Sequence, residues 1–280
     1  MKHMGRGLLA VVLWAAVSGS AGAADSLTFA PLPMETPETV VKQVKPMLAH
    51  LEKAVGVDIT IDYSSDYAEI LQKFAAGKLD LAYLGPLPYL TLRDQVSQAT
   101  PLVHFKEKSG SATYTCAIVA PADARPDLTK LKGRKVALTQ PLSTCGYLST
   151  DGLLRQAGSN LEDNLYRYLD KHDEVALAVT RGEFDLGGLK TAIGKKYAHM
   201  GLAVIAESGP LPGFALVANA KTVSKERMDK LRDALVAAEG DTLKGWGDNI
   251  RFGAVAAFDG DYDGLRRLRR KASIPNSGNF

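Results

Sequence analysis

The order of strand-like and helix-like segments constrains the fold of this chain more than any other feature of its sequence. From Ser26 onward, short apolar segments typical of strands are separated by longer segments whose apolar residues recur every three or four positions. The stretch from Thr36 to Gly56 shows the helical pattern clearly, because a hydroxyl residue and a proline open it and a glycine follows its last apolar residue. Strands that alternate with helices in this way predict mainly parallel sheets with helices on both faces.

The strand–helix pattern restarts along the chain, which indicates two lobes. Extended segments near residues 113–118 and 214–218 separate the blocks and are suited to cross between lobes. We therefore predict an α/β protein in which residues 25–113 and 215–280 form lobe 1 and residues 114–214 form lobe 2, each with a mostly parallel sheet. Ligands of such folds bind where strand ends and helix starts face each other, so the expected site is the cleft between the lobes.

The first 24 residues have the features of an export signal. Lys2 and Arg6 precede ten consecutive apolar residues from Leu8 to Val17, and small residues run from Ser18 to Ala24. A membrane-spanning helix needs about 20 apolar residues, so a retained anchor is the weaker alternative. We predict a signal peptide over residues 1–24, cleaved near Ala23 or Ala24, and a mature protein in the periplasm.

Composition and charge exclude several classes of protein. Hydrophobic residues make up 46% of the 280 residues and charged residues 23%, which fits a folded protein with a substantial core and excludes intrinsic disorder. Without the predicted signal peptide, the chain has 32 basic and 31 acidic residues. Nucleic-acid binding usually needs a basic patch or stripe, so this near-neutral balance argues against it.

The strongest candidate for a binding site is the segment Gln140–Tyr147, which follows a predicted strand and opens a predicted helix. Ser143 and Thr144 offer hydroxyl donors there, and the backbones of Cys145 and Gly146 offer N–H groups at the helix start. Small side chains allow an oxyanion to approach the backbone, and the positive end of the helix dipole favours it. The alternative is that Ser143 only caps the helix.

Short motifs elsewhere in the chain occur in a characteristic order and spacing. They are Asp66–Ile70, Gly77–Pro86, Tyr114–Val119, Leu131–Ala137, the Ser143–Thr144 loop, His172–Glu174, Ala176–Val179, Gly182–Asp185 and Ser208–Gly213. Together they resemble the phosphonate-binding-protein family, the substrate-binding proteins of phosphate, phosphite and phosphonate ABC transporters. The resemblance covers nearly the whole mature chain.

The resemblance implies a two-lobe periplasmic binding protein of the type II-like kind, which closes around its ligand. It places Ser143, Thr144 and the position of Cys145 against an anion and makes His172 a second donor. The implied partner is a membrane permease. The protein is expected to act as a monomer, without a cofactor, a metal ion or a catalysed reaction.

The resemblance also implies ligand contacts from lobe 1 and a possible charge from lobe 2. Tyr83, Leu84 and the turn at Gly85 would cover the ligand. Lys190 could add positive charge to the cleft, although a solvated surface lysine is the alternative.

This sequence departs from the family pattern at positions that bear on the ligand. Cys145 stands where the family usually has serine, and Leu84 stands where its phosphonate binders have an aromatic hydroxyl. Ala192 and Phe214 stand where those binders carry carboxylates for the amine of the ligand. We therefore predict a small oxyanion without an amine, such as phosphate, phosphite or a simple phosphonate.

Cys116 and Cys145 are the only cysteines, and three interpretations of them stay open. The first is structural: the cysteines form a disulfide, which an oxidising compartment allows, or they are two buried thiols. As free thiols they could bind arsenite, because some relatives of the family are periplasmic sensors of arsenic oxyanions that signal to a histidine kinase. The third is an enzyme with Cys145 as nucleophile and His172 as base, for which the sequence shows no third, orienting group.

Overall fold

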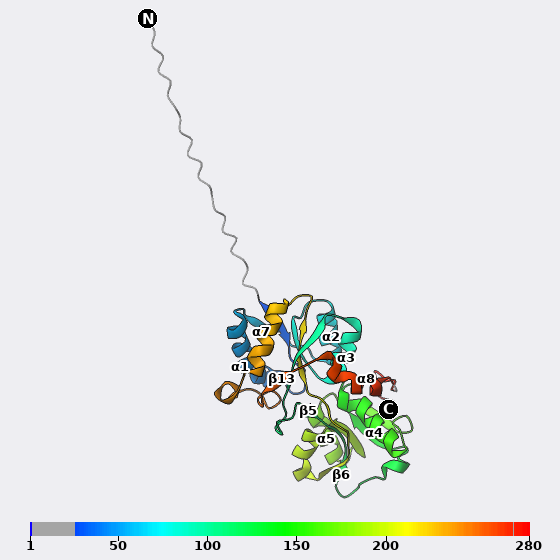
Figure 1. The fold of residues 1–280 in the computed structure, drawn as a ribbon. Coiled ribbons are helices and arrows are strands. Elements are labelled where there is room, and N and C mark those ends of the chain that lie inside the picture. The colour runs from blue at the N-terminus through cyan, green and yellow to red at the C-terminus, as the bar shows by residue number, and fades with distance from the viewer. Residues whose placement is uncertain (2–25, 271) are drawn as a thin grey trace.

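The structure is a computed structural model of the 280-residue chain, and it describes Met1, residues 26–270 and residues 272–280. The predicted signal peptide over residues 1–24 lies, apart from Met1, outside the described residues. Two α/β lobes lie one above the other in Figure 1, with the C-terminus beside the lower lobe. This arrangement confirms the predicted two-lobe α/β fold.

The first lobe, the upper one in Figure 1, is built on a six-stranded sheet with the strand order β13-β4-β12-β3-β1-β2. Helices α1 and α7 lie on one side of this sheet, and α2 and α3 lie on the other. The elements of the lobe are β1 (Leu27–Ala30), α1 (Pro37–Val55), β2 (Ile59–Ile61), α2 (Tyr67–Ala75), β3 (Leu81–Leu84), α3 (Pro86–Gln95), β4 (Ala99–Phe105), β12 (Ala215–Asn219), α7 (Lys225–Val236), β13 (Ala254–Ala256) and α8 (Asp263–Arg269).

The second lobe is built on a five-stranded sheet with the strand order β10-β6-β9-β7-β8. Its sheet lies between α4 and α5 in Figure 1. Its elements are β6 (Cys116–Pro121), β7 (Lys135–Leu138), α4 (Ser149–Ala157), β8 (Leu165–Tyr168), α5 (His172–Thr180), β9 (Leu186–Lys190), α6 (Thr191–Lys196) and β10 (Leu202–Glu207). Short 3-10 turns in the two lobes span Leu128–Lys130, Ala198–Met200, Gly240–Leu243 and Asp259–Tyr262.

Both sheets are mixed, where the sequence predicted mostly parallel ones. In the first sheet β1 pairs in parallel with β2 and β3, but β12 is antiparallel to β3 and β4, and β13 is antiparallel to β4. In the second sheet β7 pairs in parallel with β8 and β9, whereas β6 is antiparallel to β9 and β10. The strands of opposite direction are β12 and β13 in the first sheet and β6 in the second. β6 and β12 follow directly on the crossings between the lobes, which strand–helix alternation does not describe.

The two crossings run side by side. The first crossing contains β5 (Thr113–Tyr114), and the second contains β11 (Leu211–Pro212). These strands pair antiparallel, with Leu211 opposite Tyr114. A short two-stranded ribbon therefore joins the lobes, and we refer to it as the hinge.

The C-terminal segment crosses to the second lobe as well, and we call residues 274–280 the strap. Backbone N–H of Asn279 donates to the carbonyl of Tyr166 at 3.0 Å, and the Tyr166 N–H donates to the Asn279 side chain at 2.7 Å. Phe280 packs against the Arg167 guanidinium at 4.4 Å. The predicted lobe 1 extends to residue 280, but the strap lies along β8, because that edge strand offers unpaired backbone groups.

Local sequence signals explain the start of the helices that face the cleft. Asp66 caps α2 by accepting a hydrogen bond from the Glu69 N–H at 2.8 Å. Thr36 caps α1 in the same way, with Pro37 at the first helical position. α3 begins directly after Gly85, with prolines at positions 86 and 88, so few backbone N–H groups are available at its start.

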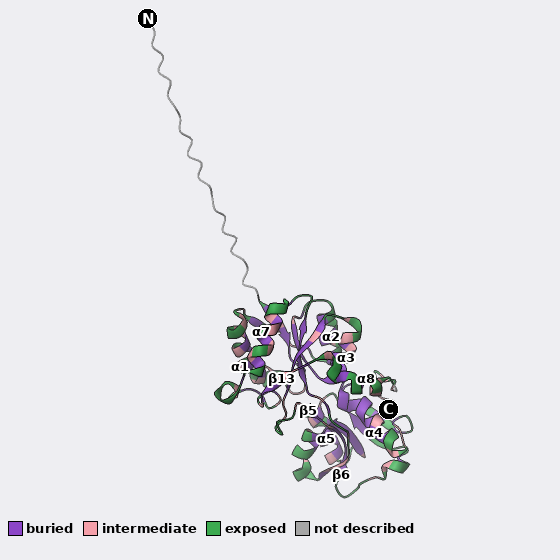
Figure 2. Cartoon of the chain, in the orientation of Figure 1, coloured by how far each residue is buried: buried purple, intermediate pink, exposed green. Residues whose placement is uncertain are grey.

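Burial follows the two sheets, whose strands are buried while the outer helix faces are exposed (Figure 2). The first lobe has one large hydrophobic cluster, and the second lobe has separate clusters on the two faces of its sheet. Among the described residues, no helix combines the length and the apolar character that a membrane span requires.

Candidate anion-binding site between the lobes

A small cavity lies between the lobes, where β3 and β7 end and α2, α3 and α5 begin. Its volume is about 10 Å³, of the order that one water-sized group requires. It is lined by Leu32, Tyr67, Gly85, Pro88 and Phe214 from the first lobe, by Tyr114 from the hinge, and by Ser143, Thr144, Cys145 and His172 from the second lobe. Each of these side chains is buried, so the lobes are closed over the site.

The segment after β7 forms an irregular turn and not the regular helix start that the sequence predicts. Residues Thr144–Leu148 form a π turn in which Gly146 has non-helical angles, and α4 begins at Ser149. The Ser143 side chain makes no capping hydrogen bond, which removes the alternative that it serves only as a cap. The N–H of Gly146 was expected to be free, but it donates to the carbonyl of Ser143 at 3.2 Å. The hydroxyls of Ser143 and Thr144 and the N–H of Cys145 remain as donors.

Side chains of the second lobe close two helix N-termini of the first lobe. The N–H of Tyr67, at the start of α2, donates to Gln140 Oε1 at 3.1 Å. The N–H of Leu87, at the start of α3, donates to Thr144 Oγ1 at 3.0 Å. Both hydrogen bonds are buried and join residues of different lobes, so they exist only when the lobes are closed.

His172 is a neutral hydrogen-bond donor held by the backbone of β9. The N–H of Lys190 donates to His172 Nδ1 at 3.1 Å, so the ring proton of the neutral imidazole lies on Nε2. Burial, with a smaller contribution from the Lys190 charge, lowers the pKa of His172 to about 4. The turn before α5 sets the ring in place, with Asp170 in the left-handed region at a φ of 64°. The Nε2–H is therefore available to an anion at neutral pH.

The depressed pKa of His172 predicts a specific loss of stability in acid. The ordinary pKa of a histidine is about 6.5, so the His172 ring of the unfolded chain becomes protonated below that pH. In the folded protein the same ring becomes protonated only near pH 4. The contribution of His172 to the free energy of unfolding is therefore fully present above pH 6.5 and is lost as the pH falls toward 4. Between pH 7 and 4.5, His172→Gln should lose less free energy of unfolding than the wild type, by about 2 kcal/mol. Urea unfolding at each pH measures the difference.

A matched control for this prediction is His199→Gln, because His199 is exposed and its Nδ1 bonds to the Lys196 carbonyl at 2.9 Å. It should keep the acid sensitivity of the wild type. Equal losses of stability for wild type and His172→Gln would contradict the buried neutral state of His172.

Cys116 and Cys145 form a disulfide, with their Cα atoms 5.0 Å apart. Cys145 lines the cavity, whereas Cys116 lies behind it at the start of β6. This pairing corrects two of the interpretations left open by the sequence. Neither sulfur is a free thiolate for arsenite, and Cys145 is not available as a nucleophile for an enzyme. No group of three or more His, Cys, Asp or Glu residues suited to a metal ion occurs within the described part of the chain.

Comparison with known proteins places this chain in a family. The sequence profile described as "ABC transporter, phosphonate, periplasmic substrate-binding protein" matches residues 29–262. The chain belongs to this family. Its members are solute-binding proteins of transport systems. A relative is the phosphate-import protein PhnD of Mycolicibacterium smegmatis, 29% identical over 278 aligned residues that cover 88% of this chain and 86% of that protein.

Solved structures share the fold of this family member. A phosphonate-binding protein of Prochlorococcus marinus, PhnD1, in complex with methylphosphonate, superimposes with a TM-score of 0.76 at 17% identity over 88% of this chain and 97% of that chain. A binding-protein component of an ABC phosphonate transporter from Pseudomonas aeruginosa gives a TM-score of 0.75 at 22% identity, over 88% of this chain and 86% of that chain. The type II-like two-lobe architecture is thus shared with these proteins.

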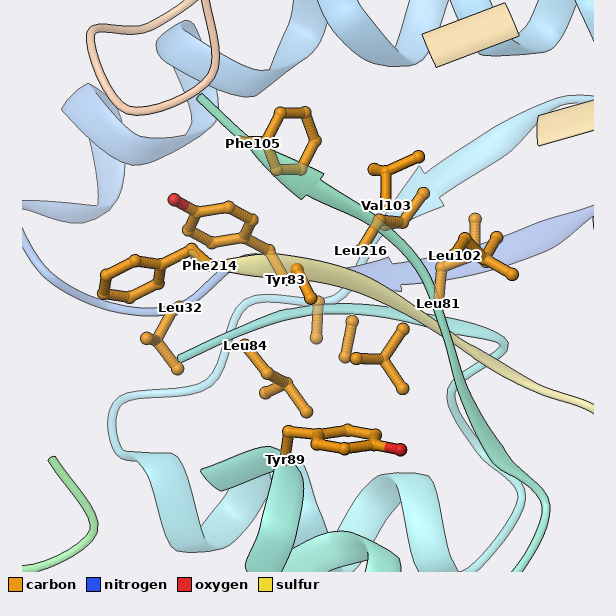
Figure 3. Close-up of a cluster of buried hydrophobic side chains, with 14 of the residues drawn as sticks. Leu32, Leu81, Tyr83, Leu84, Tyr89, Leu102, Val103, Phe105, Phe214 and Leu216 are labelled. Carbon is orange, nitrogen blue, oxygen red and sulfur yellow. The ribbon is translucent and has the colours of Figure 1, made fainter. Parts of the chain in front are cut away.

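Of the three lobe 1 residues expected to cover the ligand, only Gly85 lines the cavity. Gly85 lines the cavity, and the Phe214 ring packs closely against it. A Cβ at position 85 would lie only 3.2 Å from that ring. Tyr83 and Leu84 do not line the cavity. Tyr83 stacks on Phe214 at 5.4 Å within the hydrophobic cluster of the first lobe (Figure 3), and Leu84 is fully buried there. Because β3 is covered on both sides, its side chains serve the core.

Lys190 does not line the cavity either. Its ammonium pairs with Glu107 at 2.7 Å, and it lies 5.5 Å and 5.3 Å from the ring centres of Tyr114 and Phe214. Those two rings line the cavity, so the lysine stands beside their wall. Glu107 follows β4 in the first lobe and Lys190 ends β9 in the second, which makes this ion pair a bridge between lobes.

Sequence reasoning missed the aromatic and apolar lining of the cavity. Tyr67 and Tyr114 bring buried phenols to it, and burial raises the pKa of both, so they stay protonated at neutral pH. Leu32 and Pro88 supply apolar contacts. In the sequence, Tyr67 directly follows the α2 cap and Pro88 lies three residues after Gly85. The loops that follow strands β1 and β3 were the signal that could have indicated these lining residues.

Proposed function

We propose that this protein captures a small phosphorus oxyanion without an amine, such as phosphate, phosphite or methylphosphonate, and delivers it to an ABC permease. It works in the periplasm after removal of a signal peptide, and it catalyses no reaction. The observation that carries the proposal is the closed cavity lined by neutral donors, Ser143, Thr144 and the Nε2–H of His172. Neutral dipolar donors held in a buried site bind oxyanions without a cationic side chain, and His172 stands at the start of α5.

The chemistry of the cavity supports a ligand without an amine. None of its lining residues carries a carboxylate, since Phe214 lines the wall and Ala192 lies outside it. An ammonium group would therefore be buried without a partner, which costs several kcal/mol in practice.

Closure of the lobes is the step that a permease can sense. Hydrogen bonds from Tyr67 to Gln140 and from Leu87 to Thr144 form only across the closed cleft. A ligand held by both lobes adds further contacts that exist only in this state, and so shifts the population toward it. The closed surface is then the form that docks on the membrane partner.

Calorimetric titration tests the proposal. Phosphate, phosphite, methylphosphonate and 2-aminoethylphosphonate are titrated separately into the purified protein. At least one of the first three should bind with a Kd of about 1 μM or below, and 2-aminoethylphosphonate should bind about 100-fold more weakly than the best of them. Absence of binding by all three, or a preference for the aminophosphonate, would contradict the proposal.

A further inference from the structure

One side of the cavity is apolar and is continuous across both lobes. Leu32 and Phe214 line it from the first lobe, and they lie together beside Tyr83 in Figure 3. Cys145 lines it from the second lobe. Leu32, Phe214, Cys116 and Cys145 all belong to one hydrophobic cluster, although the cysteines lie in the second lobe. The disulfide is therefore the contribution of the second lobe to the apolar side.

The disulfide also removes a hydrogen-bonding group from the wall. A thiol would be a weak donor, but a disulfide sulfur has no hydrogen to donate and accepts only weakly. The neighbouring residues Ser143 and Thr144 both carry hydroxyls, so the side-chain donors of this loop end before Cys145, whose own donor is its backbone N–H. An oxygen or hydroxyl of a ligand placed against this sulfur would be buried without a partner.

We propose that the Cys116–Cys145 disulfide is a determinant of ligand specificity. This inference rests on the proposed function and narrows it. The sulfur side of the cavity selects an anion that carries one non-oxygen substituent, a hydrogen or a methyl group on phosphorus, over phosphate, which has oxygen at all four positions. Phosphite and methylphosphonate place three oxygens on the polar donors and one apolar group against Cys145, Leu32 and Phe214.

Two variants that differ by one hydroxyl oxygen test the inference. Cys116→Ala with Cys145→Ala lacks the disulfide and adds no donor, whereas Cys116→Ala with Cys145→Ser lacks the disulfide and adds one. We expect wild type to bind phosphite at least about 10-fold more tightly than phosphate, because burying an unpaired polar group is costly. The alanine variant should keep most of this preference. The serine variant should lose it, with the ratio of the two Kd values falling by about 10-fold relative to the alanine variant.

Each outcome of the titrations has a defined meaning. Equal affinity of wild type for phosphate and phosphite, or equal ratios in the two variants, would overturn the role of the disulfide while leaving the proposed function in place. Failure of wild type to bind any phosphorus oxyanion would overturn the proposed function and this inference with it. If the variants do not fold, the wild-type ratio decides, and a preference for phosphate overturns the inference.

Discussion

Replacing both Ser143 and Thr144 by alanine should weaken the binding of phosphite by about 100-fold or more, because each hydrogen bond to a charged group contributes about 1.5–3 kcal/mol. Both hydroxyls line the cavity, and that of Ser143 makes no capping bond within the protein. Thr144 Oγ1 also accepts the N–H of Leu87 from the other lobe, so its loss weakens closure as well as ligand contact. Calorimetry gives the affinity, and thermal unfolding without ligand reports the fold.

The matched control is Ser97→Ala with Thr242→Ala, which removes one exposed serine and one exposed threonine hydroxyl from the first lobe, away from the cavity. It should bind like the wild type. The two single variants separate the roles, since Ser143→Ala should mainly affect ligand contact while Thr144→Ala affects both. If the double alanine variant at 143 and 144 is folded and keeps wild-type affinity, the site is assigned to the wrong residues.

Glu107→Gln should weaken ligand binding by about 10-fold or more, mainly through faster dissociation, because it leaves the Lys190 ammonium without its partner in the closed protein. Lys190 has only 7% of its side chain exposed, and Glu107 has 22%. We expect opening of the lobes to separate the two residues and return the lysine to water. The cost of the variant therefore falls on closure and not on folding.

Stopped-flow measurement of association and dissociation rates tests the second prediction. Glu207→Gln is the control, because Glu207 and its partner Lys195 both belong to the second lobe, 3.9 Å apart and more exposed. That variant should keep the dissociation rate of the wild type. An unchanged dissociation rate in Glu107→Gln, or a loss of thermal stability equal to its loss of affinity, would show that the ion pair does not act on closure.

The helices and strands of the two lobes could be predicted from the sequence, because N-terminal caps and the glycines that end helices are local signals. Thr36 and Pro37 open α1 and Gly56 ends it, as the sequence suggests. The direction of β12, which is antiparallel to β3 and β4, could not be predicted in this way, because it depends on how the second crossing enters the sheet. The strap escaped prediction for the same reason, since its partner Tyr166 is 113 residues away from Asn279 in the chain.

The hydrogen-bond donors of the candidate site could be predicted from the sequence, whereas most of its aromatic and apolar lining residues could not. Ser143, Thr144 and His172 stand at the ends of predicted strands, where a ligand of an α/β protein is expected. The pairing of Lys190 with Glu107 could not be predicted, because a lysine at a strand end is equally suited to a ligand or to a carboxylate of the other lobe. The state of the cysteines needed their Cα separation, which sequence does not contain.

The strap has a practical consequence for anyone who attaches a reporter to this protein. Three segments join the lobes, and the third ends at Phe280, which is held against β8 by Arg167. A fluorescent protein or purification handle fused after Phe280 would sit against β8, beside the segment through which the first lobe reaches the second, and we expect it to alter the affinity that it is meant to report. The same label placed ahead of β1 is attached to the first lobe alone, and we expect it to leave the affinity unchanged.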